Sequence, residues 1–139
     1  MFRNILLAVD GSVHSNLAAD YAGGMAAAFN ATLFIVHAYP QTSDLLGYDD
    51  FEKLVARRKS SGQTILNKVR ERLADRGLTI HEDLLEGPEA EAILAAGTAQ
   101  SVDLIVMGTR GLGTIEGIMF GSVSRKVTHH APCPVMLIR

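Results

Sequence analysis

The chain has 139 residues, of which 47% are hydrophobic. A chain of this length can bury about 68% of the surface that its unfolded form exposes, so we expect one domain that needs no disulfide or metal to fold. The formal net charge is −2 and the basic residues are dispersed, which argues against nucleic acid or an anionic membrane as a partner.

The N-terminal half alternates apolar runs with helical repeats. Residues 4–9 are almost continuously apolar, as in a strand covered on both faces, and residues 32–38 repeat this pattern. Between them, an apolar side chain recurs at every fourth position, which predicts a helix: Leu17, Tyr21, Met25 and Phe29. After the weakly patterned residues 39–50, a longer helix is predicted to end at Gly77; its apolar positions are Phe51, Leu54, Val55, Ile65, Leu66, Val69 and Leu73.

The C-terminal half continues the alternation. Residues 78–85 form a more polar strand, which indicates an edge position, and Pro88 then opens a helix whose apolar face includes Ile93 and Leu94. Two apolar strands follow at residues 103–107 and 135–138, with a helix at about 122–130 between them. Strict alternation of strands and helices predicts an α/β fold, with a parallel sheet covered by helices on both faces.

A glycine-rich segment follows the strand at residues 103–107. Residues 108–124 read GTRGLGTIEGIMFGSVS, and the segment ends where the last helix begins. Glycines leave room for backbone N–H groups to surround a phosphate, and the first N–H groups of a helix lack partners within the helix. The segment therefore predicts an anion site at the carboxyl end of a strand.

The glycine spacing resembles a family signature. The segment matches the G-x2-G-x9-G-[ST] element of ATP-binding universal stress proteins, with Gly108, two residues, Gly111, nine residues and then Gly121-Ser122. Three other segments resemble that family at corresponding places: residues 5–12 (ILLAVDGS), 36–38 (VHA) and 124–135 (SRKVTHHAPCPV). The resemblance covers the whole chain and implies a Rossmann-like sheet of five parallel strands in the order 3-2-1-4-5, with ATP as the ligand.

The resemblance also implies roles for individual residues. Ala8 and Ala38 would approach the adenine, and Asp10 would lie beside the adenosine. The phosphates and ribose would be held by the glycine element and the start of the helix, at Gly108, Arg110, Gly111, Gly113, Gly121, Ser122 and Val123. These positions agree with the rule that ligands of open α/β sheets bind where the strand order reverses.

Structural alternatives exist for several of these residues. Asp10 could cap the following turn through Ser12, and Ser122 could serve only as a helix N-cap. Arg110 could pair with a phosphate or be a solvated loop residue. Residues 39–50 could form a solvated connector or a lid over the site. Cys133, between two prolines, is expected to be a packed apolar side chain.

The sequence lacks several catalytic motifs. It contains no P-loop, no Rossmann fingerprint after the first strand and no nucleophile elbow. Asp10 is the only carboxylate that we place near the glycine element, where it could help to hold Mg²⁺ or Mn²⁺ brought in by the nucleotide. We therefore expect ATP binding without efficient turnover; a slow ATPase or phosphotransferase and a nucleotide-free scaffold are the alternatives.

Partners and location follow from the last strand and from composition. The apolar strand Val135–Ile138 is expected at a sheet edge, where pairing with its twin would form a homodimer; a covered monomeric edge is the alternative. We expect ATP to order residues 39–50 and 108–121, which an unidentified regulatory protein would then recognise. A lone cysteine, no signal peptide and no transmembrane span favour a cytoplasmic protein with no membrane partner.

Overall fold

The computed structural model describes residues 1–43, 47–109 and 121–139, apart from the side chain of Tyr48. All strand pairs are parallel, in the order β3-β2-β1-β4-β5. The strands are Asn4–Ala8 (β1), Thr32–Tyr39 (β2), Thr79–Glu86 (β3), Leu104–Gly108 (β4) and Val135–Ile138 (β5). The predicted fold class and strand order are confirmed, and the predicted edge position of the mixed strand β3 is correct.

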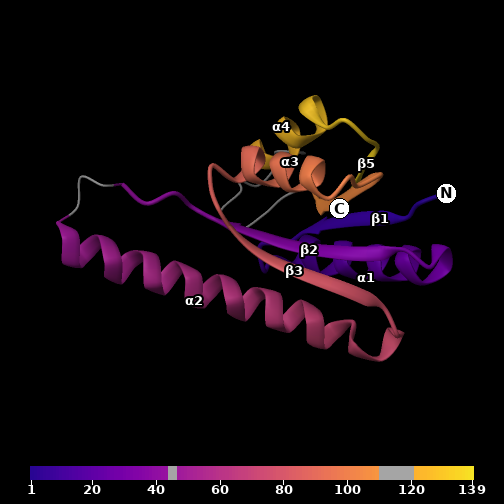
Figure 1. The fold of residues 1–139 in the computed structure, drawn as a ribbon, viewed down its shortest axis with the longest axis horizontal. Coiled ribbons are helices and arrows are strands. Elements are labelled where there is room, and N and C mark those ends of the chain that lie inside the picture. The colour runs from indigo at the N-terminus through magenta and orange to yellow at the C-terminus, as the bar shows by residue number, and fades with distance from the viewer. Residues whose placement is uncertain (44–46, 110–120) are drawn as a thin grey trace.

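Helices cover both faces of the sheet (Figure 1). The helices are Val13–Phe29 (α1), Tyr48–Arg72 (α2), Glu89–Ala99 (α3) and Ser122–His130 (α4), with a short 3-10 helix at Ala74–Arg76 (η1). One core cluster joins the sheet to α1 and α2, and the other joins it to α3 and α4. Strands β1 and β4 are buried along almost their whole length because both clusters cover them.

Helix α1 does not bury the side chains that predicted it. Leu17, Tyr21 and Phe29 are 39%, 56% and 43% exposed. The buried face consists of small side chains, at Ser15, Ala18, Ala19, Ala22, Gly23 and Ala26. Small side chains let the helix axis approach the sheet closely, so the larger apolar residues are displaced to the flank of the helix.

The long helix α2 ends earlier than Gly77. It stops at Arg72 and is followed by η1, and Gly77 then adopts a φ of 64° as the C-cap of η1. A glycine favours this left-handed conformation because it has no Cβ. The N-terminal part of α2 extends beyond the strands (Figure 1). No described helix combines the length and the apolar character that crossing a membrane requires.

Candidate functional site

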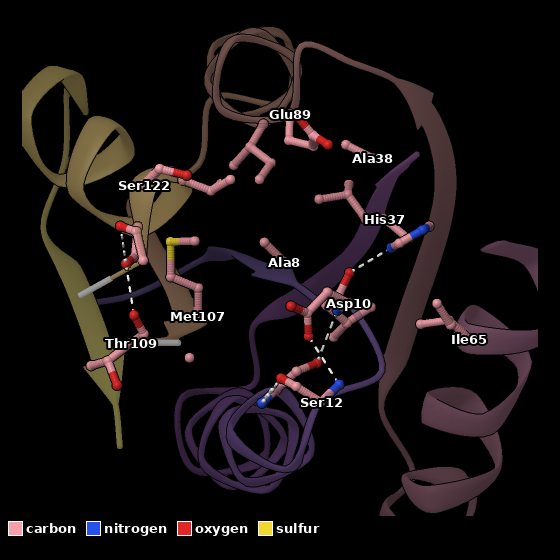
Figure 2. A pocket seen from close by; sticks show the side chains of 18 of the residues that line it. Ala8, Asp10, Ser12, His37, Ala38, Ile65, Glu89, Met107, Thr109 and Ser122 are labelled. Atoms are coloured by element: carbon pink, nitrogen blue, oxygen red, sulfur yellow. Dashed lines mark hydrogen bonds between the residues drawn. The ribbon is translucent and has the colours of Figure 1, made fainter. Parts of the chain in front are cut away.

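A pocket of about 410 Å³ lies at the carboxyl ends of the central strands. The last residues of β1, β2 and β4 and those just beyond them line it, together with residues near the starts of α3 and α4 (Figure 2). Its volume falls within the range of small-molecule sites, and its location is where open parallel sheets bind ligands.

The two ends of the pocket differ in chemistry. One wall is apolar, with Ala8, Val36, Ala38 and Ile93. The opposite end is formed by backbone and small polar residues at the end of β4 and the start of α4, namely Gly108, Thr109, Gly121, Ser122 and Ser124. Such a pocket suits an elongated ligand with one flat apolar part and one anionic part.

Seven of the ten predicted site residues line this pocket. They are Ala8, Asp10, Ala38, Gly108, Gly121, Ser122 and Val123. The other three, Arg110, Gly111 and Gly113, lie outside the described residues. The structure therefore brings together residues that are more than 100 positions apart in the sequence, while their contacts with a ligand stay predictions.

The start of α4 is fixed to the end of β4. The N–H of Gly121 donates to the carbonyl oxygen of Thr109 at 2.7 Å, and the Ser124 hydroxyl donates to the same oxygen at 2.9 Å. Gly121 is the N-cap of α4, with no side chain capping the described first turn, so Ser122 is the first helical residue and not the cap. The first N–H groups of α4 thus meet the pocket where the helix dipole favours negative charge.

Asp10 forms the turn that the structural alternative anticipated. Its Oδ1 accepts the N–H of Ser12 at 2.9 Å, and the Ser12 hydroxyl oxygen in turn accepts the N–H of Ser15 at 3.2 Å, which caps α1. Asp10 also lines the pocket. One carboxylate oxygen therefore supports the loop after β1 while the residue borders the site, so the two interpretations are compatible.

Among the described residues, two further ionisable side chains line the pocket that were not predicted from the sequence, His37 and Glu89. The Nδ1 of His37 lies 2.8 Å from the carbonyl oxygen of Val9, which links β2 to the end of β1. Glu89 borders the pocket at the start of α3, so the pocket has a second carboxylate besides Asp10, on the side away from Thr109, while the prediction that Asp10 is the only carboxylate near the glycine element stays a prediction. The sequence held a signal for Glu89, because a helix that follows a parallel strand begins at the carboxyl edge of the sheet.

Other chemistry-bearing side chains lie away from this pocket. Cys133 packs against the core cluster beneath α3 and α4, as expected, and burial is the main reason why its thiol pKa is raised. Within residues 1–43, 47–109 and 121–139, no three His, Cys, Asp or Glu side chains group closely enough to hold a metal ion.

Comparison with known proteins decides the family. The sequence model of the universal stress protein family matches residues 1–139. The chain belongs to the universal stress protein family. A universal stress protein of Thermus aquaticus, described as lying in the QAH/OAS sulfhydrylase 3′ region, is 48% identical over 142 residues, covering all of both chains.

Solved structures of universal stress proteins have the same fold. Universal stress protein UspA from Lactobacillus plantarum superimposes with a TM-score of 0.89 at 23% identity, over 99% of this chain and 97% of that one. A universal stress protein solved in complex with cAMP superimposes with a TM-score of 0.76 at 29% identity, over 99% of this chain and 97% of that one. These likenesses place the strand order and helix layers of this universal stress protein in a known architecture.

Proposed function

We propose that this universal stress protein binds ATP in the 410 Å³ pocket and acts as a nucleotide-dependent regulator in stress adaptation. The observation that carries the proposal is the pairing, in one pocket, of an apolar wall with the first turn of α4. The wall suits a purine base, and the unpaired N–H groups of a helix start suit phosphates. The related structure solved with cAMP supports an adenine nucleotide as the ligand class.

Binding at the start of α4 can be tested with a matched pair of glycine variants. Gly121 and Gly47 are both helix N-caps in extended conformation, with φ, ψ of −71°, 163° and −59°, 153°. Neither φ is positive, so valine is compatible with both backbones, and both variants lose a similar helix cap. Gly121 lines the pocket and Gly47 does not.

The expected result is a loss of ATP binding in Gly121→Val alone. Isothermal titration calorimetry with ATP should give comparable affinities for the wild type and Gly47→Val and at least a tenfold weaker affinity for Gly121→Val, because the side chain fills the space of the phosphates. ATP should also accompany the wild-type protein through purification, as detected by mass spectrometry. Absence of heat with the wild type would instead favour a nucleotide-free scaffold.

We also propose that binding, not turnover, is the activity. Asp10 lines the pocket, which keeps a slow ATPase as the second candidate because a carboxylate can help to hold a nucleotide-bound divalent ion. Phosphate release with Mg²⁺ above a no-protein control, and its loss in Asp10→Asn, would establish that candidate. Asparagine retains the Oδ1 acceptor that Ser12 uses, so this variant removes charge without removing the turn.

A regulator of this kind needs a surface that changes with the nucleotide. We propose that ATP orders the connections between β2 and α2 and between β4 and α4, within residues 39–50 and 108–121, and that a regulatory protein recognises them. We also propose that the protein is a homodimer located in the cytoplasm. Amide hydrogen exchange in these segments should slow when ATP is added; exchange that does not change would count against the switch. Fractionation of cells tests the location.

A further inference from the structure

Glu89 is held at the apolar end of the pocket by the turn that precedes it. The N–H of Gly87 donates to the carbonyl oxygen of Tyr39 at 2.7 Å, so the turn between β3 and α3 rests on the end of β2. Ala38, the neighbour of Tyr39, and Glu89 both line the pocket. Figure 2 shows Glu89 and Ala38 on the side of the pocket away from Thr109.

The Glu89 carboxylate faces a wall that has little hydrogen-bonding capacity. Figure 2 draws Ala38 beside Glu89, and Ala38 belongs with Ala8, Val36 and Ile93 to the aliphatic part of the pocket lining. Glu89 is half-buried, and its carboxylate makes no hydrogen bond or ion pair with any described residue. Glu91, two positions later, is by contrast paired with Lys126 at 2.5 Å. The pocket therefore presents one unpaired carboxylate beside an otherwise apolar surface.

Glu89 and the start of α4 differ in the charge that they favour, which sets a direction for a nucleotide. The start of α4 favours phosphate, whereas the carboxylate of Glu89 repels phosphate and can only accept hydrogen bonds. On the basis of the proposed ATP binding, we propose that Glu89 is a specificity-determining residue that accepts a hydrogen bond from the 6-amino group of the base. It thereby selects 6-aminopurine nucleotides and places the base against Ala38.

A purely structural role for Glu89 makes a different prediction. Glu89 and Glu91 are both in the first turn of α3, where negative charge interacts favourably with the helix dipole. If this were the only role, removing Glu89 would lower stability without changing the choice of base. A test must therefore compare two ligands that differ only in the amino group.

Calorimetry measures the affinities of two ligands, ATP and purine riboside triphosphate, which lacks only the 6-amino group. The proteins compared are the wild type, Glu89→Ala, Glu89→Gln and Glu91→Ala. In the wild type, ATP should bind more tightly than the analogue. The ratio of the two affinities should fall about fivefold to tenfold in Glu89→Ala, because a hydrogen bond to a charged group is lost for ATP only. Glu89→Gln, which keeps an acceptor oxygen, should give an intermediate ratio.

The matched control is Glu91→Ala, which removes the same charge from the same turn of α3 but does not line the pocket. It should keep the wild-type ratio. An unchanged ratio in Glu89→Ala, or equal weakening of both ligands, would overturn the role of Glu89 while leaving ATP binding intact. A wild type that binds neither triphosphate would overturn the proposed function and this inference with it.

Discussion

Gly108 and His14 are in direct contact, at the point where β4 ends beneath the start of α1. A Cβ at position 108 would lie 2.8 Å from the Cβ of His14 and 3.0 Å from its carbonyl carbon. The glycine therefore meets a packing requirement as well as the proposed phosphate contact. Loss of ATP binding in a Gly108 variant would not separate these two roles.

The first prediction is that Gly108→Ala destabilises the protein by about 1–3 kcal/mol, because the new methyl group overlaps backbone of α1 that cannot rotate away. Urea unfolding measures this change. Gly24→Ala is the control, since a Cβ there meets nothing within 4 Å. Because alanine favours a helix interior more than glycine does, this variant should raise the free energy of unfolding by roughly 0.5–1 kcal/mol. Equal stabilities for Gly108→Ala and the wild type would mean that the start of α1 shifts freely.

The second prediction concerns the side chain that fixes α4. Ser124 is 3% exposed and its hydroxyl donates to the carbonyl oxygen of Thr109. Ser124→Ala should lower the free energy of unfolding by about 1 kcal/mol and weaken ATP binding, because the first turn of α4 is no longer held at the pocket. Urea unfolding and calorimetry measure the two effects.

Thr98→Ala serves as the control for Ser124→Ala. The hydroxyl of Thr98 also donates to a backbone carbonyl, that of Leu94, but it lies on the exposed side of α3. Its loss should leave ATP affinity unchanged. Unchanged ATP affinity in Ser124→Ala as well would show that the position of α4 does not depend on this bond.

Much of the fold was predictable because burial on both faces of a parallel sheet leaves a plain sequence pattern. The boundaries of β5 are as predicted, β1 and β2 differ by one residue at one end, and β3 and β4 are shifted by one residue at both ends. The buried face of α1 was not predictable from large apolar residues, because alanines pack there and Tyr21 remains 56% exposed. Hydrophobic periodicity identifies a helix, but the distance between helix and sheet decides which side chains are buried.

The candidate site was predictable to the extent that family motifs mark it. Asp10, Ala38 and Gly121 meet in one pocket although no short-range pattern joins them. Glu89 was missed because its importance depends on the turn that rests on Tyr39, a tertiary contact between residues far apart in sequence. A helix start next to a strand end is a weak signal until the strand order is known.

The third prediction concerns pH and the pairing of α1 with α2. Hydrogen bonds from Arg72, at 2.9 and 2.7 Å, are the main reason why the pKa of Asp20 is lowered from 3.8, and Arg76 adds to the effect. Because the pKa of Asp20 is lower in the folded state, the ionised carboxylate stabilises the protein at pH values above its ordinary pKa. This contribution is lost as the pH falls through the lowered pKa.

Asp20→Asn should therefore be slightly less stable than the wild type near neutral pH, and the difference should disappear in strong acid. Denaturant unfolding at several pH values measures the difference, which should also shrink in high salt because the pair is partly exposed. Asp75→Asn, at an exposed position in η1, should show no such dependence. A difference that persists in strong acid would mean that the pair is not its source.

The last prediction concerns the open edge of the sheet at β5. The carbonyl oxygens of Pro134 and Ile138 accept hydrogen bonds from the N–H groups of Ile105 in β4 and of Thr109 just after it. In a parallel pair, the N–H and C=O of one residue point to the same side, so alternate residues, including Leu137, point theirs away from β4. An edge of this kind can pair with a second copy.

Leu137→Pro should convert the proposed homodimer into a monomer, because proline removes the outward N–H without touching the bonds to β4. Leu137→Ala is the matched control: it loses a similar amount of packing against the core cluster beneath α4 but keeps the N–H, so it should remain dimeric. Light scattering coupled to size-exclusion chromatography gives the mass of each variant. A proline variant with twice the monomer mass would show that the subunits meet elsewhere, and a monomeric wild type would show that the edge is covered in another way.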